Sequence, residues 1–284
     1  MPPLAHALSV DVEDWYHDGG DSTAAGLEHR VERNLDLLLG LLAKHDARAT
    51  FFFLGEVADR FPALVHRVHN AGHEIGTHGY HHRSVTTLLR HEFRADVKRS
   101  VDLLQELTGN AVLGYRAPYF SIKAGIGWPI EQLARLGLTY DSSILAIDRP
   151  PGLELVCPRA PFRHPNGLWE FPVAVLRMLF FWYLPIASGA GLRLVPRRVL
   201  DRSLVRFERD IGSGVFYLHP WELDPDSPTS NAWGRWFLRV GRRRLPERLD
   251  ELMTERTFKP IRDLFRAHID DAGMAAAAAG GGVQ

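Results

Sequence analysis

Two histidines and an acidic segment are the residues of this sequence whose types and spacing best suit chemistry at a metal ion. His78 and His82 stand four positions apart in the run His-Gly-Tyr-His-His. On a helical turn such positions share one face, so both imidazoles could reach one ion from the same side. Much earlier, Asp11 to Asp14 reads Asp-Val-Glu-Asp and could supply a carboxylate. Two nitrogens and one oxygen, with open positions left over, suit zinc or a similar divalent ion in hydrolysis.

The overall composition is that of an ordinary globular protein. The chain has 284 residues, of which 45% are hydrophobic and 24% charged, so it can bury a sizeable core. Its formal net charge is zero, which provides no general attraction to nucleic acid, and we expect no nucleic-acid partner. Cys157 is the single cysteine, so an intrachain disulfide framework and a cysteine zinc cluster are both excluded.

The start of the chain and its strongest apolar run bear on location. The segment from Met1 to His6 has neither the basic region nor the apolar stretch of a secretory signal. The apolar run at 176–187 is interrupted by Arg177 and is well short of the roughly 20 residues that a spanning helix needs. We therefore expect a cytoplasmic protein. The aromatic residues at 179–184 leave two alternatives, a buried core segment or a peripheral contact with the inner membrane or a lipid-linked substrate.

Alternating strand and helix patterns run along most of the chain and predict its fold. Strands are expected at 7–13, 49–54, 74–77, 112–116, 138–141, 168–173 and 214–218. Helices are expected at 30–45, 56–71, 88–107, 127–136 and 196–211, with a last helix between 246 and 268. Repeated βα units predict an α/β fold with about seven parallel strands in a closed or nearly closed barrel. We expect a single domain over 1–268, whose C-terminal part begins near 150, and a disordered tail over 269–284.

Polar residues follow the ends of five of the predicted strands. They are the acidic segment after the first strand, His78 and His82 after the third, Arg116 and Tyr119 after the fourth, Asp141 after the fifth, and His219 after the last. In a parallel barrel these strand ends open onto the same rim, where substrates bind. Their common position predicts one active site.

In these segments the sequence resembles the NodB-type polysaccharide deacetylases, which are carbohydrate esterases of family 4. The resemblance covers roughly residues 7–225. The segments Ser-Val-Asp-Val-Glu-Asp-Trp at 9–15 and Tyr-Leu-His-Pro-Trp-Glu at 217–222 are most similar to the variant found with exosortase and exopolysaccharide genes. The resemblance implies a distorted (β/α) barrel with a C-terminal helical extension and a divalent metal, usually zinc. It also implies hydrolysis of N-acetyl groups of amino sugars in a bacterial exopolysaccharide or its lipid-linked precursor.

The resemblance implies a metal-binding set and a general base. His78 and His82 would bind the metal together with one residue of the acidic segment. Asp14 is the preferred third ligand, and Glu13, which strand alternation places on the same side as Asp11, is the alternative. Asp11 would be the general base that deprotonates the attacking water.

The resemblance also implies the residues that support the base and protonate the leaving group. Arg116 would pair with Asp11 and keep it charged. The backbone N–H of Tyr119 would help to hold the oxyanion. His219 would be the general acid that protonates the leaving amine, with Asp141 as its partner.

Two other interpretations retain part of this pattern. The same barrel and site could hydrolyse small cyclic amides or ureides, although the long proline-rich loop at 150–165 favours a larger substrate. The chain could also be a catalytically inactive carbohydrate-binding protein. The arginines between 235 and 248 are expected to form a solvated helix face or, alternatively, a patch for phosphate or anionic lipid.

Overall fold

The structure is a computed structural model that describes most of the chain. The described residues are 4–17, 27–123, 126–145, 158–177, 183–184, 186–228, 239–266 and 268–269. The predicted tail apart from residue 269, most of the aromatic run at 179–184 and the first half of the proline-rich loop therefore lie outside the described residues. Among the described residues, none of the helices has both the length and the apolar character needed to cross a membrane.

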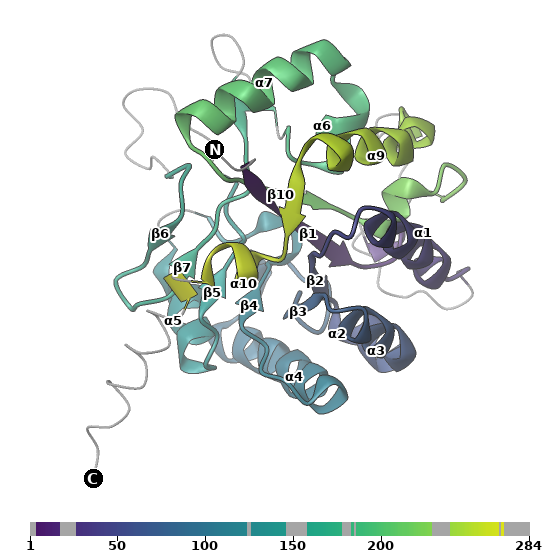
Figure 1. Ribbon diagram of the computed structural model, residues 1–284. Coiled ribbons are helices and arrows are strands. Elements are labelled where there is room, and N and C mark those ends of the chain that lie inside the picture. The colour runs from purple at the N-terminus through teal and green to yellow at the C-terminus, as the bar shows by residue number, and fades with distance from the viewer. Residues whose placement is uncertain are drawn as a thin grey trace.

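A curled, mostly parallel sheet forms the centre of the molecule (Figure 1). Its strands are β1 (Ala5–Val12), β2 (Thr50–Phe53), β3 (Glu74–Thr77), β4 (Gly114–Tyr115), β5 (Tyr140–Asp141), β6 (Phe162–Arg163), β7 (Trp169–Glu170), β10 (Val215–Leu218) and β11 (Thr257–Lys259). The order is β10-β1-β2-β3-β4-β5-β7-β6, and β11 pairs with β1. Only β6 runs antiparallel to its neighbour, β7. A separate antiparallel pair is formed by β8 (Leu176–Arg177) and β9 (Tyr183–Leu184).

The two ends of this sheet approach one another. A bridge between Val173, just past β7, and Val215 in β10 joins them in parallel fashion, and the backbone N–H of Ala174 donates to the carbonyl of Val215. The sheet thus curls toward closure, which confirms the predicted α/β fold with a distorted barrel.

Except for α10 (Ile261–Leu264), which packs against the inner side, the helices lie around the outside of the curled sheet (Figure 1). They are α1 (Val31–Lys44), α2 (Gly55–Arg60), α3 (Pro62–Asn70), α4 (Arg90–Thr108), α5 (Gly127–Arg135), α6 (Gly189–Leu194), α7 (Arg197–Asp210), α9 (Leu245–Glu255) and α10 (Ile261–Leu264). In α1, for example, Leu35, Leu38 and Leu42 recur at helical spacing and are fully buried. Burial of such an apolar stripe holds each helix against the sheet.

Strand β1 separates two apolar clusters and thereby places polar residues inside the barrel. Leu8, Val10 and Val12 belong to the large cluster between sheet and helices, whereas Ala7 belongs to an inner cluster. That inner cluster also contains Phe52, Tyr140, Phe171, Val173, Val215, Ile261 and Phe265. Because side chains alternate along a strand, Asp11 lies on the same side as Ala7. The inner side of β1 therefore carries both apolar packing and the first candidate catalytic residue.

One predicted helix is interrupted in the structure. The helix expected at 56–71 is broken at Phe61 (φ −129°), because Pro62 disfavours helical geometry in the residue before it and starts α3 anew. The helix expected somewhere between 246 and 268 is present as α9, and β11 and the short α10 follow it. This three-residue strand buries only Phe258 and is too short to give a periodic signal.

Candidate active site

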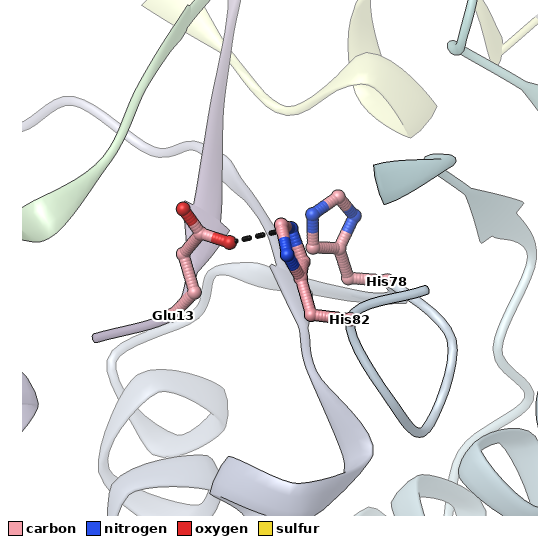
Figure 2. Close-up of side chains that lie close together, drawn as sticks. All are labelled: Glu13, His78 and His82. Carbon is pink, nitrogen blue, oxygen red and sulfur yellow. Dashed lines mark ion pairs between the residues drawn. The ribbon is translucent and has the colours of Figure 1, made fainter. Parts of the chain in front are cut away.

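The side chains of Glu13, His78 and His82 converge at the rim of the sheet (Figure 2). Glu13 follows β1 and the two histidines follow β3, so neighbouring parts of the sheet position all three. One ligand atom from each lies within 4.8 Å of the others. Across the described ranges, this is the one set of three histidine, cysteine or carboxylate side chains close enough to share an ion.

The two histidines approach one another through a loop, so the prediction of a shared helical face was wrong. Residues 78–82 lie outside any helix, and Gly79 takes a φ of +77°, in the left-handed region that glycine tolerates. The carboxylate of Asp96 accepts from the backbone N–H groups of Tyr80 (2.8 Å) and His81 (3.1 Å). A Cβ on Gly79 would lie 2.9 Å from that same carboxylate. The left-handed conformation of Gly79 and the hydrogen bonds to Asp96 thus determine the shape of the loop.

Both imidazole rings are oriented by backbone carbonyls. Nδ1 of His78 donates to the carbonyl of Arg116 (2.8 Å), and Nδ1 of His82 donates to the carbonyl of His17 (3.0 Å). With Nδ1 occupied in this way, Nε2 of each ring is the nitrogen available to a metal. Burial lowers the pKa of His78 to about 4, so this ring is neutral at pH 7, as a metal ligand must be.

The carboxylate of Glu13 is buried between His82 and His219. Its Oε2 lies 2.7 Å from Nε2 of His82, but the contact does not have hydrogen-bond geometry. Burial alone would raise the pKa of Glu13, yet His82 and His219 together hold it well below its usual range. A buried carboxylate oxygen that has no hydrogen-bond partner and lies near two imidazole nitrogens is available to a metal ion. Two nitrogens and one oxygen therefore fit zinc or a similar divalent ion.

Asp14 lies apart from this metal-binding group. Its Oδ2 accepts from the backbone N–H groups of Arg30 (2.8 Å) and Val31 (3.2 Å) at the start of α1, and its Oδ1 accepts from that of Trp15 (2.9 Å). These bonds anchor the end of β1 to the helix. The geometry thus favours Glu13 over Asp14 as the third ligand, because Glu13 is two residues beyond Asp11 and points to the same side.

The predicted pairing of Asp11 with Arg116 is present at the rim. The guanidinium is fully buried, and its Nη1 lies 3.3 Å from Oδ2 of Asp11. Its Nη2 donates to the hydroxyls of Ser9 (3.0 Å) and Ser142 (3.1 Å). Held by residues of β1 and by Ser142 just past β5, the arginine fixes the orientation of a carboxylate that is itself almost wholly buried.

Tyr119 forms one side of the rim beside the histidines. Its backbone has a φ of +57° and that of Phe120 a φ of +49°, so the chain makes a left-handed turn at this point. The ring of Tyr119 meets that of His82 edge-on, with 4.4 Å between the ring centroids, and its hydroxyl donates to the carbonyl of His17 (3.0 Å). Non-glycine residues in this conformation are uncommon and occur often at functional sites.

His219 lies beside the metal-binding group, next to Glu13. Its Nε2 lies 3.6 Å from Oε1 of Glu13, and its Nδ1 lies 3.3 Å from Oε2 of Glu222. The ring stacks on Trp221 with 4.9 Å between centroids and an angle of 16° between planes. Burial opposes the charged form, but Glu222 and Glu13 together raise the pKa of His219 to about 10. The ring is therefore in its acidic form at neutral pH.

The carboxylate that contacts His219 is Glu222, whereas Asp141 was the predicted partner. Asp141 accepts a short hydrogen bond from Ser143 and is completely buried. Burial and the neighbouring Glu170 raise the pKa of Asp141 well above its usual range. Sequence reasoning missed Glu222, although its position three residues after His219, across a proline, was a usable signal for a turn that brings both together.

A second residue that sequence reasoning missed is His17. Its carbonyl orients His82, and its side chain lines a groove of about 430 Å³ together with Tyr16, Phe61 and Tyr80. Burial lowers the pKa of His17 to about 4. None of Glu13, His78 and His82 lines the groove, which adjoins the metal-binding group through His17.

Two known families match successive parts of the chain. Residues 21–140 match the polysaccharide deacetylase family, and residues 142–266 match a domain of unknown function, DUF3473. We call these the first and second matched regions. The chain therefore carries a polysaccharide deacetylase domain, as the resemblance of its motifs predicted, followed by the domain of unknown function.

Curated relatives match parts of the chain. A peptidoglycan-N-acetylglucosamine deacetylase of Bacillus cereus is 38% identical over 96 residues, which cover 34% of this chain and 35% of that protein. A peptidoglycan deacetylase of Helicobacter pylori is 30% identical over 154 residues, which cover 52% of this chain and 51% of that protein. The chain thus spans between about a third and a half of the length of these relatives.

Solved structures share the fold over nearly the whole chain. A Mycobacterium smegmatis protein classed with the polysaccharide deacetylases has a TM-score of 0.65 and 23% identity, covering 93% of this chain and 89% of that one. The Bc1960 peptidoglycan N-acetylglucosamine deacetylase has a TM-score of 0.54 and 18% identity, with coverage of 93% and 89%. BA3943 of Bacillus anthracis, a pseudoenzyme of carbohydrate esterase family 4, has a TM-score of 0.52 and 15% identity, with coverage of 93% and 66%. At these identities the matches establish a common fold.

Proposed function

We propose that the protein is a metal-dependent hydrolase that removes N-acetyl groups from amino sugars of a bacterial polysaccharide. The observation that carries this proposal is that a candidate base and a candidate acid both lie beside one metal-binding group. Asp11, paired with Arg116, is two residues before Glu13 and on the same side of β1, and His219 lies next to Glu13. The curated relatives whose names record peptidoglycan deacetylation support the same reaction class.

Glu13, His78 and His82 would hold the divalent ion. Their donor set fits zinc, and their carbonyl-oriented rings present Nε2 to a common point. A bound ion would supply activation of the attacking water and polarisation of the acetyl carbonyl. The protein's own part here is to bind and orient, with the imidazole of His78 kept neutral by burial.

Asp11 would take the proton of the attacking water. Nη1 of Arg116 donates to the carboxylate of Asp11, and the hydroxyls of Ser9 and Ser142 accept from Nη2 of the same arginine. This arrangement restricts the base to one orientation. The backbone N–H of Tyr119 would donate to the carbonyl oxygen as its charge develops, since the left-handed turn brings this part of the chain to the rim.

His219 would give its proton to the leaving amine as the carbon–nitrogen bond breaks. Addition of water to the acetyl carbon and loss of the sugar amine yield acetate and the free amino sugar. The imidazolium, which Glu222 stabilises, carries the proton that the amine nitrogen requires. An amine leaves poorly without that proton, so the acid is essential for amide substrates.

The substrate would be an exopolysaccharide or its lipid-linked precursor, with zinc as the metal. This narrower proposal is supported by the resemblance of the segments at 9–15 and 217–222 to exopolysaccharide-associated deacetylases, and by the second matched region. The groove beside His17 has the volume to accept a further sugar unit. A cytoplasmic location, with contact to the inner membrane for a lipid-linked substrate, stays a prediction of the sequence.

The test is release of acetate by the purified protein. Apoprotein prepared with a chelator is supplied with zinc, cobalt or no metal, and incubated with N-acetylglucosamine oligomers, peptidoglycan, an N-acetylated exopolysaccharide and allantoin. We expect metal-dependent acetate from at least one polysaccharide, and background release from Asp11→Asn and His78→Ala. Polysaccharide binding without acetate would identify an inactive carbohydrate-binding protein, and turnover of allantoin alone would identify a ureide hydrolase. Activity that survives both substitutions would overturn the mechanism.

A further inference from the structure

Glu222 is bound to His219 through both the backbone and the side chain. Its Oε2 accepts from the backbone N–H of His219 (3.1 Å) and faces Nδ1 of the ring (3.3 Å). His219 immediately precedes a short 3₁₀ turn, Pro220–Leu223, and Glu222 is the third residue of that turn. Because a carboxylate can only accept, the ring must carry its hydrogen on Nδ1. Nε2 is then the nitrogen that faces Glu13 and the reaction.

The carboxylate of Glu222 is itself fixed by the second matched region. Nε of Arg193, in α6, lies 3.4 Å from Oε1 of Glu222, and both side chains are almost completely buried. The backbone at Gly189 approaches the carboxylate so closely that a Cβ there would lie 2.2 Å from Oε2. Nη1 of Arg193 also donates to the carbonyl of Val240 (2.6 Å). The carboxylate of Glu222 is therefore confined by the guanidinium of Arg193 and by the backbone at Gly189.

The ring of His219 is confined from its face as well. Trp221 stacks on it, and the indole Nε1 donates to Oε1 of Glu13 (3.3 Å). Trp221 in turn packs against Arg242, whose guanidinium carbon lies 5.0 Å from the centre of the indole ring. Arg242 is buried and donates to the carbonyl of Ser227 (2.9 Å), so it is not the solvated residue that the sequence suggested. Apart from Glu13, the residues that confine Glu222 and His219 lie between positions 189 and 242, inside the second matched region.

We propose that Glu222 is the positioning residue of the general acid His219, and that the domain of unknown function supplies this acid half of the active site. Arg193 and Gly189 contribute to this positioning, because they keep the carboxylate of Glu222 next to Nδ1 of His219. The inference rests on the proposed function, since it gives Glu222 a task in amide hydrolysis. It assigns to the second matched region a direct part in chemistry, in place of a purely structural role.

The decisive experiment compares leaving groups. Wild type and Glu222→Gln are assayed on an N-acetylglucosamine oligomer, whose amine must be protonated to leave, and on 4-nitrophenyl acetate, whose phenolate leaves unaided. We expect kcat for the amide to fall about 10- to 100-fold in Glu222→Gln, with KM and metal content unchanged and ester hydrolysis within about threefold. Glu222→Asp, which keeps the charge, should recover part of the amide rate.

The matched control is Glu170→Gln, which alters another fully buried glutamate of the second matched region. It should change amide and ester rates by the same factor. Equal losses on both substrates in Glu222→Gln, or a loss confined to KM or to metal content, would overturn the inference. Failure of wild type to release acetate from any polysaccharide would instead overturn the proposed function.

Gly189→Ala provides a second variant should Glu222→Gln not fold. The added methyl group would displace the carboxylate without removing it. We expect the same selective loss of amide hydrolysis, by about 10-fold. If wild type does not turn over the ester, the division between kcat and KM on the amide, together with metal content, decides the outcome, because a general distortion of the site would alter KM or metal content as well.

Discussion

The metal half and the acid half of the site are built in different ways. Glu13, His78 and His82 stand directly after β1 and β3, and carbonyl groups of the main chain orient the two imidazoles. His219 stands after β10, but its orientation depends on side chains, above all on Glu222. Backbone contacts tolerate changes of neighbouring side chains, whereas side-chain contacts can be lost by one substitution. The acid half should therefore be the more easily tuned part of the site.

The two halves also come from different parts of the sequence. The histidines of the metal half lie in the first matched region, residues 21–140, and Glu13 just precedes it. The acid half lies within the second matched region, residues 142–266. Since β10 pairs with β1, the sheet itself brings the two halves together. Neither region contains a complete site, so we infer that the two act as one catalytic unit.

The largest effect is expected from removing a metal-binding imidazole. His78→Ala should abolish metal binding at stoichiometric zinc and reduce acetate release to background, because the two remaining ligands hold a divalent ion too weakly. Metal analysis after gel filtration, alongside the acetate assay, checks this. A variant with one equivalent of zinc and normal turnover would place the metal elsewhere.

A smaller effect, without loss of metal, is expected from the base. Asp11→Asn keeps the size of the side chain but cannot take a proton, so kcat/KM should fall by about 10²- to 10⁴-fold. Zinc content should remain that of wild type, since Asp11 is not part of the metal-binding group. Loss of zinc from this variant would show that the division between base and ligands is misassigned.

Asp14 should affect stability more than chemistry. Asp14→Ala removes three hydrogen bonds to backbone N–H groups, at Trp15, Arg30 and Val31. We expect the free energy of unfolding to fall by about 1–3 kcal/mol, the cost of leaving buried donors unpaired. Urea denaturation measures this change. Zinc affinity equal to that of wild type is the accompanying expectation, and a large loss of affinity would contradict it.

The last effect leaves metal binding unchanged and concerns the pH dependence of stability in the second matched region. Burial raises the pKa of Glu170 to about 7. A raised pKa means that the folded state retains the proton longer than the unfolded chain does, so Glu170 lowers stability as pH rises from about 4.5 to about 7. Glu170→Gln should therefore gain up to about 3 kcal/mol relative to wild type across that window. Urea titrations of both proteins at pH 5 and pH 7 would show this, and an unchanged difference would contradict it.

Much of the fold was predictable because it depends on local patterns. The strand predicted at 74–77 coincides with β3, and the helix predicted at 196–211 contains α7. Strand ends then placed Asp11, Arg116 and His219 at one rim, where the structure has them. These features follow from periodicity and from the parallel arrangement, which a single sequence records.

The remainder depended on contacts between distant residues. Asp14 is not available to the metal because its carboxylate accepts hydrogen bonds from the backbone N–H groups at the start of α1, a contact between residues 16 and 17 positions apart. Likewise, the partner of His219 depended on the close approach of Gly189 to Glu222. Such contacts are set by how separate elements pack, and hydrophobic periodicity carries no information about them.

The most direct test of the account is a calorimetric zinc titration of the apoprotein and its Glu13→Gln variant, with Asp14→Ala as the matched control. The account predicts one site in wild type and in Asp14→Ala with equal affinity, and at least a 100-fold weaker affinity in Glu13→Gln, because a neutral amide replaces the anionic ligand. Retention of wild-type affinity by Glu13→Gln, together with its loss in Asp14→Ala, would contradict the metal-binding group on which the mechanism depends.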